Sequence, residues 1–451
     1  MRRPTTRSLA GGAAGIAAGI LGGIVLGSGS AGGTASPARR APVEAAHLPP
    51  LLTMPGEPIT LRYAIVCSPR DDGLPCDGSG DVYLRPGRRG PFRRLALGRG
   101  DEAVDGRYFV DVPAQIASSR EGFSYYAVLR DEENGDSVTV PSGGEAAPQH
   151  SLPLRNAVEV RVGLHAFGST RARDVRVITA EWGSDVGEAG VEGTRELGFV
   201  GPSSFDVDAH GTVTVLDQVN GRLQRWARDG VAATPVDVSG GLADMAVEPD
   251  GSVAVLEPPN RSTPAPMLRR FDATGASKGV QRLADRTWAK LADGPDGPVV
   301  LQQPSEQWMP AALDRAAQAR HGTPGRPLGG GRELLVQRVG AGELRLAEVA
   351  GNATVRAWRI TSATTLGEVQ LAESLGSRIV VVAKTYTEDQ GEYVVLVLDR
   401  AGVVERFGLS APQWAEAAPL ARFRLAGSSL YRLGSTPSGV FVDRFDLEVA
   451  R

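Results

Sequence analysis

Three polar side chains with complementary chemistry, Asp217, Asn220 and Arg222, follow an alternating apolar stretch within six residues. A carboxylate that ends a strand can accept hydrogen bonds from the next turn, and asparagine tolerates the left-handed backbone of such turns. Arg222 stands two residues beyond Asn220 and can pair with Asp217 across a hairpin. These roles predict a structural turn. The alternative is a ligand-binding rim, as on folds whose loops surround a channel.

Three acids, Glu181, Asp217 and Glu257, form the candidate ligand-binding set. If they face a common channel, their carboxylates could bind a basic group or a divalent cation, because Ca²⁺ and Mg²⁺ prefer oxygen ligands. The sequence assigns no catalytic residue, no metal ligand and no cofactor. The alternative is that the protein binds a divalent cation.

Nucleophilic hydrolysis has little support in the sequence. Of the five histidines, only His165 stands in a strand-like context, where packing is the expected role, while His47 and His150 fall in predicted linkers. No G-x-S-x-G elbow, H-E-x-x-H helix or phosphate-binding loop is present. The sequence therefore favours a protein that binds over one that catalyses.

The two cysteines, Cys67 and Cys76, flank a short segment rich in Pro, Asp and Gly. A metal site would need further ligands, and this segment has no histidine. Both cysteines fall on the predicted exported side of the membrane, where disulfides persist. We therefore expect a structural disulfide that closes a short loop.

The amino terminus has the pattern of an export signal. Cationic residues in MRRPTTR precede an uncharged apolar run over residues 9–27. This run suits either a cleaved signal peptide or a membrane anchor, because 19 residues are just enough to span a bilayer. Glycines every four residues, which would let two helices approach closely in lipid, favour an anchor; they are Gly11, Gly15, Gly19, Gly23 and Gly27.

The overall composition and charge exclude some classes of function. The chain has 451 residues, of which 41 % are hydrophobic and 22 % are charged, as in folded proteins of two or three domains. The formal net charge of −3 gives no field that would hold nucleic acid or an anionic membrane surface. We therefore expect no nucleic-acid partner, and membrane contact only through the amino-terminal segment.

Two segments that differ in composition and in residue pattern follow the amino-terminal leader. Residues 28–55 are rich in Gly, Ser, Ala and Pro and are predicted to be a flexible linker. Residues 56–150 alternate apolar and polar side chains in short runs separated by turn signals, which predicts a small antiparallel β-sandwich. The pairing of GRYFVDVPA with GFSYYAVLRDEENGD resembles the Ig- or fibronectin-type modules of exported proteins.

Residues 157–447 contain an internal repeat of strand, turn and strand. The same residue type recurs 40 positions apart in the pairs Gly211 and Gly251, Val213 and Val253, Val215 and Val255, and Asn220 and Asn260. Units of 40 to 46 residues with about four strands each are typical of β-propeller blades. The span predicts six blades, and five or seven are the alternatives because the third and fourth units are the least regular. The segment GSTRARDVRVITAEWG would complete the last blade.

The stretch from Gly201 to Gly230 resembles an NHL repeat, with Asp217, Asn220 and Arg222 on the polar positions of that pattern. The resemblance implies a propeller whose loops bind a partner. Six-bladed propellers also house metal-dependent lactonases, and TAEWG around Glu181 is weakly similar to one of their ligand motifs. A lactonase-like hydrolase is therefore the alternative function.

These observations predict an all-β protein in which a small amino-terminal β-sandwich precedes a six-bladed β-propeller. We expect an exported protein, extracellular or in the cell envelope, in which residues 9–27 are either a cleaved signal or a membrane anchor. Its leading function is a scaffold that binds a protein, a peptide or a glycan.

Overall fold

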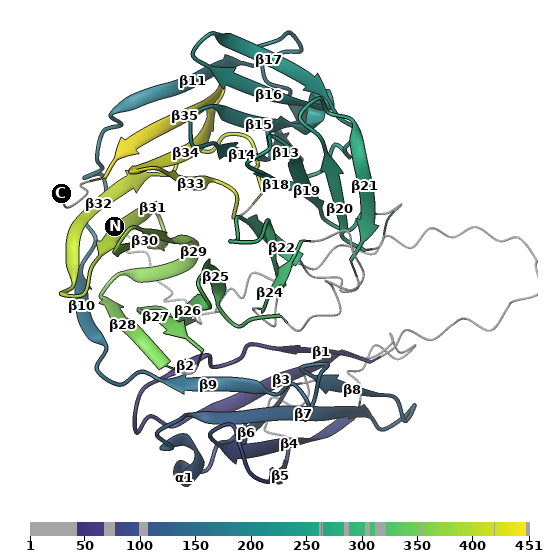
Figure 1. The fold of residues 1–451 in the computed structure, drawn as a ribbon, viewed down its shortest axis with the longest axis vertical. Coiled ribbons are helices and arrows are strands. Elements are labelled where there is room, and N and C mark those ends of the chain that lie inside the picture. The colour runs from purple at the N-terminus through teal and green to yellow at the C-terminus, as the bar shows by residue number, and fades with distance from the viewer. Residues whose placement is uncertain are drawn as a thin grey trace, which may run out of the picture. The chain divides into compact units, whose positions relative to one another are not determined.

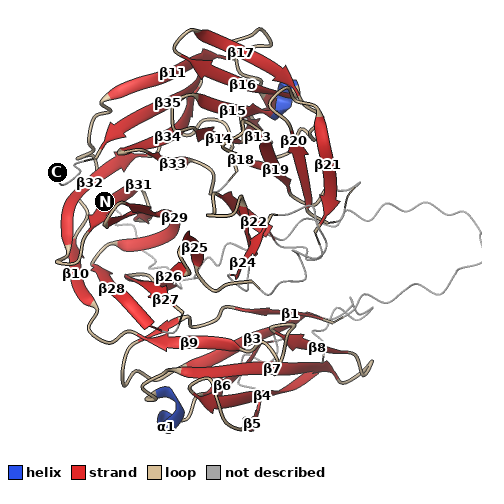
Figure 2. Cartoon of the chain, in the orientation of Figure 1, coloured by secondary structure: helices blue, strands red, loops and turns tan. Residues whose placement is uncertain are grey.

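The computed structural model describes residues 43–66, 77–98, 107–260, 263, 265–283, 288–302, 307–311, 322–351, 353–418 and 420–447. Strands dominate these ranges (Figure 2), with a short helix α1 (Ala114–Ala117) and a 3-10 turn over Gln218–Asn220. The predicted all-β class is confirmed. Cys67, Cys76 and the leader at 1–27 lie outside the described residues. None of the helices in the described ranges is long and apolar enough to cross a membrane.

Two sheets form the amino-terminal part of the compact unit that spans residues 42–451. The first has the order β1 (Glu44–His47), β3 (Thr60–Val66), β6 (Arg107–Asp111). The second has the order β2 (Leu52–Thr53), β9 (Gln149–Pro153), β7 (Phe123–Asp131), β4 (Gly78–Pro86), β5 (Arg93–Ala96), with β8 (Ser137–Val140) paired to β7. Alternate residues of both sheets, such as Leu61 and Leu84, share one apolar core.

The predicted linker over residues 28–55 is wrong for its second half. Residues 44–47 pair with β3, and Leu52 and Thr53 pair with β9. Leu51 and Leu52 are buried against Leu335 and Ala347 of a distant sheet. These strands have only four and two residues, too few for an alternating pattern to be recognised. His47 and His150, expected in linkers, lie in strands β1 and β9.

Residues 158–447 fold into sheets arranged around a centre (Figure 1). The first three have the strands β14 (Ser204–Val207), β15 (Val213–Asp217), β16 (Arg222–Ala227) and β17 (Gly230–Pro235); β18 (Asp244–Val247), β19 (Val253–Glu257), β20 (Met267–Phe271) and β21 (Ser277–Arg282); and β22 (Trp288–Ala292), β23 (Val299–Gln302) and β24 (Gln307–Pro310).

The next three sheets have the strands β25 (Arg326–Gly329), β26 (Arg332–Val339), β27 (Glu343–Ala350) and β28 (Ala353–Ser362), with β10 (Val158–Gly163) parallel to β28; β29 (Thr365–Leu375), β30 (Arg378–Tyr386), β31 (Gly391–Leu398) and β32 (Val403–Ser410); and β33 (Phe423–Ala426), β34 (Ser429–Thr436), β35 (Gly439–Asp446) and β11 (Val175–Glu181). A separate hairpin joins β12 (Glu192–Thr194) to β13 (Gly198–Val200).

The strand that is given first for each of the six sheets above lies toward the centre. β14 contacts both β18 and β33, β18 contacts β22, and β29 contacts β33. The ring is closed by strands from its two ends, because the early strand β11 pairs with the late strand β35. The predicted strand within GSTRARDVRVITAEWG therefore does complete the last sheet. Radial sheets closed in this way are a β-propeller, as the sequence predicted.

Each sheet is apolar on both faces because it packs between two neighbours. In β30, Ile379 and Val381 join the core shared with the preceding sheet, whereas Val380 and Val382 join the core shared with the following one. Successive side chains of a strand point to opposite faces, so a continuous apolar run serves two cores. Burial on both faces explains the run IVVVA.

The repeated glycines lie in the tight turns between first and second strands. Gly211 and Gly251 adopt φ values of +82° and +81°, a left-handed backbone that glycine reaches without steric cost. These turns fix the hairpin register that places one short strand of each sheet at the centre.

Candidate functional site

The three residues Asp217, Asn220 and Arg222 lie together at the end of β15. Asp217 has no exposed surface, and its Oδ2 accepts hydrogen bonds from Arg222 Nε at 2.8 Å and from Asn220 Nδ2 at 2.9 Å. Gly221 supplies a left-handed backbone with φ +61°. The ion pair is local, since its partners are cross-strand neighbours in the β15–β16 hairpin.

The same three residues hold the segment 183–190, which follows β11. Arg222 donates to the carbonyl oxygens of Ser184 at 2.6 Å, Asp185 at 2.8 Å and Glu188 at 2.9 Å. The amide of Gly190 donates to Asp217 Oδ1 at 2.9 Å. Asn220 also donates to a carbonyl of this segment. The polar set thus fastens the connection between the closing strand and the first repeat.

The candidate acids Glu181, Asp217 and Glu257 are not brought onto the central axis. Asp217 and Glu257 end second strands, and Glu181 ends the outer strand β11. Glu257 is buried and pairs with Arg269 Nε at 2.7 Å, while Glu181 is exposed. Among the described residues, no three His, Cys, Asp or Glu side chains are grouped so that they could hold a metal. The cation-binding arrangement expected for a lactonase-like set is therefore absent from these acids.

A different polar cluster occupies the centre, and each inner strand contributes one charge to it. The residues of this axial network are Asp206 in β14, Asp244 in β18, Lys290 in β22, Arg326 in β25, Glu373 in β29 and Arg424 in β33. Three of these residues are acids and three are bases, and the carboxylate of Asp293, directly after β22, adds a further negative charge beside them.

One half of the axial network is centred on Asp244. Its Oδ1 accepts hydrogen bonds from Arg424 at 2.8 Å and from the Ser204 hydroxyl at 2.7 Å, and its Oδ2 accepts from the amide of Leu291 at 2.7 Å. Arg424 Nε lies 3.7 Å from Asp206 Oδ1. These contacts join four inner strands, β33, β14, β18 and β22.

The other half joins the remaining inner strands. Lys290 Nζ donates to the carbonyl oxygen of Gln370 in β29 at 2.8 Å. Arg326 pairs with Glu373 at 2.5 Å and donates to the carbonyl oxygen of Asp293 at 3.0 Å. Every inner strand is thus connected to another through charged side chains.

Burial changes the acid–base properties of the network. Asp206 is 6 % exposed, and desolvation raises its pKa to about 7 although the charge of Arg424 opposes the rise. The negative charge of Asp293 adds to this increase. Lys290 is 7 % exposed, and desolvation followed by repulsion from Arg424 lowers its pKa to about 8. Burial thus brings the pKa values of both groups closer to neutrality, and the network fills the centre with the protein's own charges.

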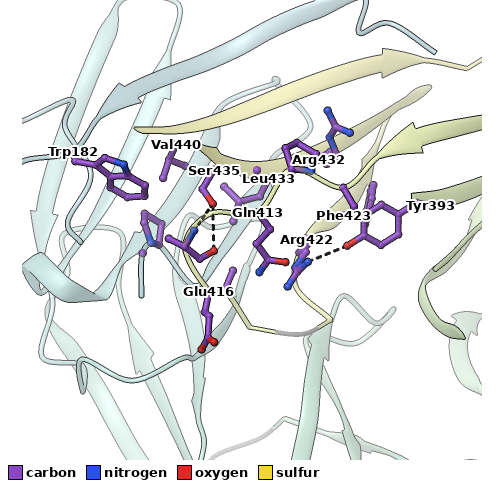
Figure 3. Close-up of a pocket in the computed structure, with 17 residues that line it drawn as sticks. Trp182, Tyr393, Gln413, Glu416, Arg422, Phe423, Arg432, Leu433, Ser435 and Val440 are labelled. Carbon is purple, nitrogen blue, oxygen red and sulfur yellow. Dashed lines mark hydrogen bonds between the residues drawn. The ribbon is translucent and has the colours of Figure 1, made fainter. Parts of the chain in front are cut away.

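A hollow lies beside the starts of the inner strands β14 and β33 (Figure 3). Trp182 and Val440 line one side, and the polar ends of Gln413, Glu416 and Arg422 lie on the other. The volume open to the centre of a water molecule is about 20 Å³. The enclosed part has room for one or two waters, and the hollow is partly open to solvent.

Arg422 is the half-buried charge of this hollow. One terminal nitrogen, Nη1, donates to the Tyr393 hydroxyl at 3.0 Å. Its Nε is buried and has no hydrogen-bond acceptor among the described residues. This nitrogen is enclosed by the protein's own atoms. Sequence reasoning missed the hollow because 411–422 is an irregular connection without a repeated pattern.

Sequence reasoning also missed the axial network, although a signal was present. Each inner strand is a short apolar run interrupted by a charge, as in SFDV, ADMAV, AKLA and FRLA. The charges do not stand at equivalent places in the repeats, because at the 40-residue offset Asp206 aligns with Ala246 and Asp244 aligns with Ser204. His165, expected to pack, lies after β10 and bonds Glu392 through Nε2 at 2.7 Å.

No family model matches the chain. Similar solved structures include a catalytically inactive virginiamycin B lyase from Staphylococcus aureus with quinupristin, at 9 % identity and TM-score 0.30, covering 58 % of this chain and 99 % of that one. A gluconolactonase from Xanthomonas campestris shows 14 % identity and TM-score 0.26 over 62 % and 99 %. Apo AztD from Citrobacter koseri shows 12 % identity and TM-score 0.26 over 82 % and 96 %.

These identities and TM-scores transfer no activity to this chain. Its class is defined by its own sheets: a β-propeller protein whose inner strands carry a buried charged network.

Proposed function

We propose that this chain is an exported or membrane-anchored protein of the cell envelope that binds a protein, a peptide or a glycan through its propeller. The cationic leader and apolar run over residues 1–27 support the export assignment. A rigid ring of sheets supports a binding role, because it holds connecting loops in fixed positions.

The observation that carries this proposal is the buried charged network on the axis. Asp206, Asp244, Lys290 and Arg424 are buried and bonded to other parts of the propeller, so they hold the inner strands together instead of lying open to a ligand. Recognition is therefore assigned to the loops at the ends of the ring, where the hollow around Arg422 lies. Glu181, Asp217 and Glu257 have no part in it.

We also propose that the six described sheets of residues 158–447 are the six blades of an NHL-like propeller. The fit of Asp217, Asn220 and Arg222 to that repeat supports this assignment. The two amino-terminal sheets around one core support an Ig-like sandwich that acts as a spacer between the membrane and the propeller.

The export proposal is tested by expressing the full chain with a carboxy-terminal tag and treating intact cells with protease. We expect the tag in the envelope or the medium and accessible to the protease. A protected tag in the cytoplasmic fraction would contradict export.

The binding proposal is tested with the purified full chain on peptide and glycan arrays, together with elemental analysis of bound metal. We expect a saturable ligand and no stoichiometric divalent cation. A stoichiometric cation with lactone hydrolysis and no array ligand would support the hydrolase instead.

A further inference from the structure

The outer face of the amino-terminal sheet that contains β4, β5 and β7 carries cations and aromatic rings. Tyr126, Tyr83 and Arg94 stand opposite one another in the register of β7, β4 and β5, so their side chains lie on the same face. Arg85 and Arg130 follow at even spacing along β4 and β7 and share that face. The other face of the sheet carries the apolar core that the two amino-terminal sheets share.

Two arginines of this outer face are positioned by one buried acid. Asp81 is buried, and its Oδ2 accepts hydrogen bonds from Arg94 at 2.7 Å and from Arg130 at 3.4 Å. The side chains of Arg94 and Arg130 are nevertheless 64 % and 43 % exposed. They line a hollow with about 220 Å³ open to the centre of a water molecule. Two cations that share one carboxylate thus keep a positive charge and further N–H donors within reach of a ligand.

The turn between β4 and β5 adds more positive charge. The turn and its flanks, RPGRRGPFRR, contain five arginines and no acid, and we call this segment the arginine turn. Arg89 and Arg93 are exposed and have no hydrogen bond or ion pair with the described residues. The acids Glu121 and Glu333 act on a third arginine of the turn, Arg88. The arginine turn therefore presents two exposed cations that the described part of the chain leaves unpaired.

Aromatic rings give the same face an apolar surface. Tyr83 and Tyr126 stack with ring centroids 4.7 Å apart, and Phe92 packs edge-on against Tyr126 at 5.1 Å. The guanidinium of Arg85 lies 4.2 Å from the centre of the Phe92 ring, which fixes the arginine turn on this stack. All three rings are partly exposed. Sugar rings have apolar C–H faces that pack against aromatic rings, and polar substituents that do not.

These features together indicate a class of ligand. The cations of this face extend over three strands and the arginine turn, so a single small anion would leave most of them unpaired. A polymer with a carboxylate on each unit can reach several arginines at once, and a carboxylate pairs well with a guanidinium. The aromatic rings between the cations favour a polymer of sugars. The formal net charge of −3 opposes a polymer as densely charged as nucleic acid.

We propose that this outer face binds an acidic polysaccharide, with uronate carboxylates held by Arg94, Arg130 and the arginine turn. The surface belongs to the amino-terminal sheets and not to the propeller. The inference therefore goes beyond the proposed function and shares with it only the exported location.

The test measures binding of polygalacturonate oligomers to the full chain by calorimetry in mild detergent. The other arms are neutral dextran oligomers, single-stranded DNA with the same number of charges, and vesicles that contain phosphatidylglycerol. We expect polygalacturonate to bind more tightly than any of these by about 10-fold or more. Added salt should weaken the binding, because the cations lie at the surface.

Two double variants test the arginines. Arg94→Gln with Arg130→Gln removes the pair held by Asp81 and should lower the affinity for polygalacturonate by about 10- to 100-fold. Arg89→Gln with Arg93→Gln removes exposed cations that make no contacts, and should lower it by about 3- to 10-fold. If the first variant does not fold because Asp81 loses its partners, the second variant decides the question.

The matched control is Arg228→Gln with Arg400→Gln, which removes two exposed arginines from turns of the propeller. It should bind polygalacturonate as the natural chain does. Equal binding of dextran would overturn the inference, as would unchanged binding by the variants of the outer face. Tighter binding of DNA or of the vesicles would assign the face to nucleic acid or to a membrane surface instead. A propeller ligand found on the arrays should bind all these variants normally, so the two proposals fail separately.

Discussion

At the scale of single residues, burial decides how the charges of the axis behave. Asp206 is surrounded by protein, so ionisation costs desolvation energy that Arg424, at 3.7 Å, compensates only in part. Arg424 instead makes its shorter contact, 2.8 Å, with Asp244. Because Arg424 lies closer to Asp244 than to Asp206, it compensates the charge of Asp206 only weakly. Desolvation therefore leaves the pKa of Asp206 near neutrality.

The raised pKa of Asp206 predicts a pH-dependent stability. Its folded-state value of about 7 exceeds its ordinary 3.8, so the folded protein binds more protons than the unfolded chain between about pH 4 and 7. This contribution is complete below pH 4 and is lost as the pH rises through 7. In urea unfolding between pH 5 and 7, Asp206→Asn should make the slope of the unfolding free energy against pH less negative by up to about 1.4 kcal/mol per unit.

The control for this measurement is Asp229→Asn, which changes an exposed acid in a turn. For this variant, the slope of the unfolding free energy against pH should equal that of the natural chain. If Asp206→Asn also leaves the slope unchanged, Asp206 is ionised throughout this range and burial does not control its charge.

At the scale of elements, the closing segment 183–190 depends on a neighbouring repeat. Its carbonyl oxygens accept from Arg222, and the amides of Gly187 and Gly190 donate to Gln224 and Asp217. A connection without regular structure must satisfy its backbone groups by such contacts. The polar positions of the first repeat therefore act in ring closure.

Arg222→Ala should release this segment without opening the ring. Loss of a buried charged donor with several partners removes roughly 3 kcal/mol of local stability. Hydrogen exchange of a peptide covering residues 183–190 should therefore become about 100-fold faster. Arg228→Ala, in the exposed β16–β17 turn, is the matched control and should not change this exchange. Protection that persists in Arg222→Ala would mean that the segment is held by other contacts.

At the scale of the whole described unit, the amino-terminal sheets are joined to the propeller through β2. The main chain of Leu52 accepts from Arg345 Nη1 at 2.9 Å and donates to Gln337 Oε1 at 2.6 Å. Arg345 is 4 % exposed and forms a two-pronged ion pair with Glu57, with contacts of 2.5 and 2.7 Å. This pair is therefore the polar centre of the apolar contact made by Leu51 and Leu52.

A double-mutant cycle measures the coupling energy between Arg345 and Glu57. Arg345→Met should destabilise the protein more than Glu57→Gln, because Arg345 also bonds Leu52 and Glu343. The coupling energy between the two substitutions should be about 1 to 3 kcal/mol in chemical unfolding. A coupling energy near zero would show that the two charges act independently in solution.

The local part of the architecture could be read from the sequence. The hairpin register, the turn at Gly211 and the pair of Asp217 with Arg222 involve residues close in the chain, so alternation and turn chemistry encode them directly. The strand that closes the ring could be predicted as well, because a repeat array that begins with a spare strand must end one strand short.

Tertiary structure alone decided the rest. Arg424 meets Asp244 across 180 residues, and Lys290 meets Gln370 across 80. Those contacts arise because ring closure brings the inner strands to one axis, which no local pattern encodes. The strands at 43–53 and the hollow at Arg422 likewise depend on surfaces built elsewhere in the chain. The amino-acid sequence determined which segments become strands, and the closed ring determined which of their charges meet.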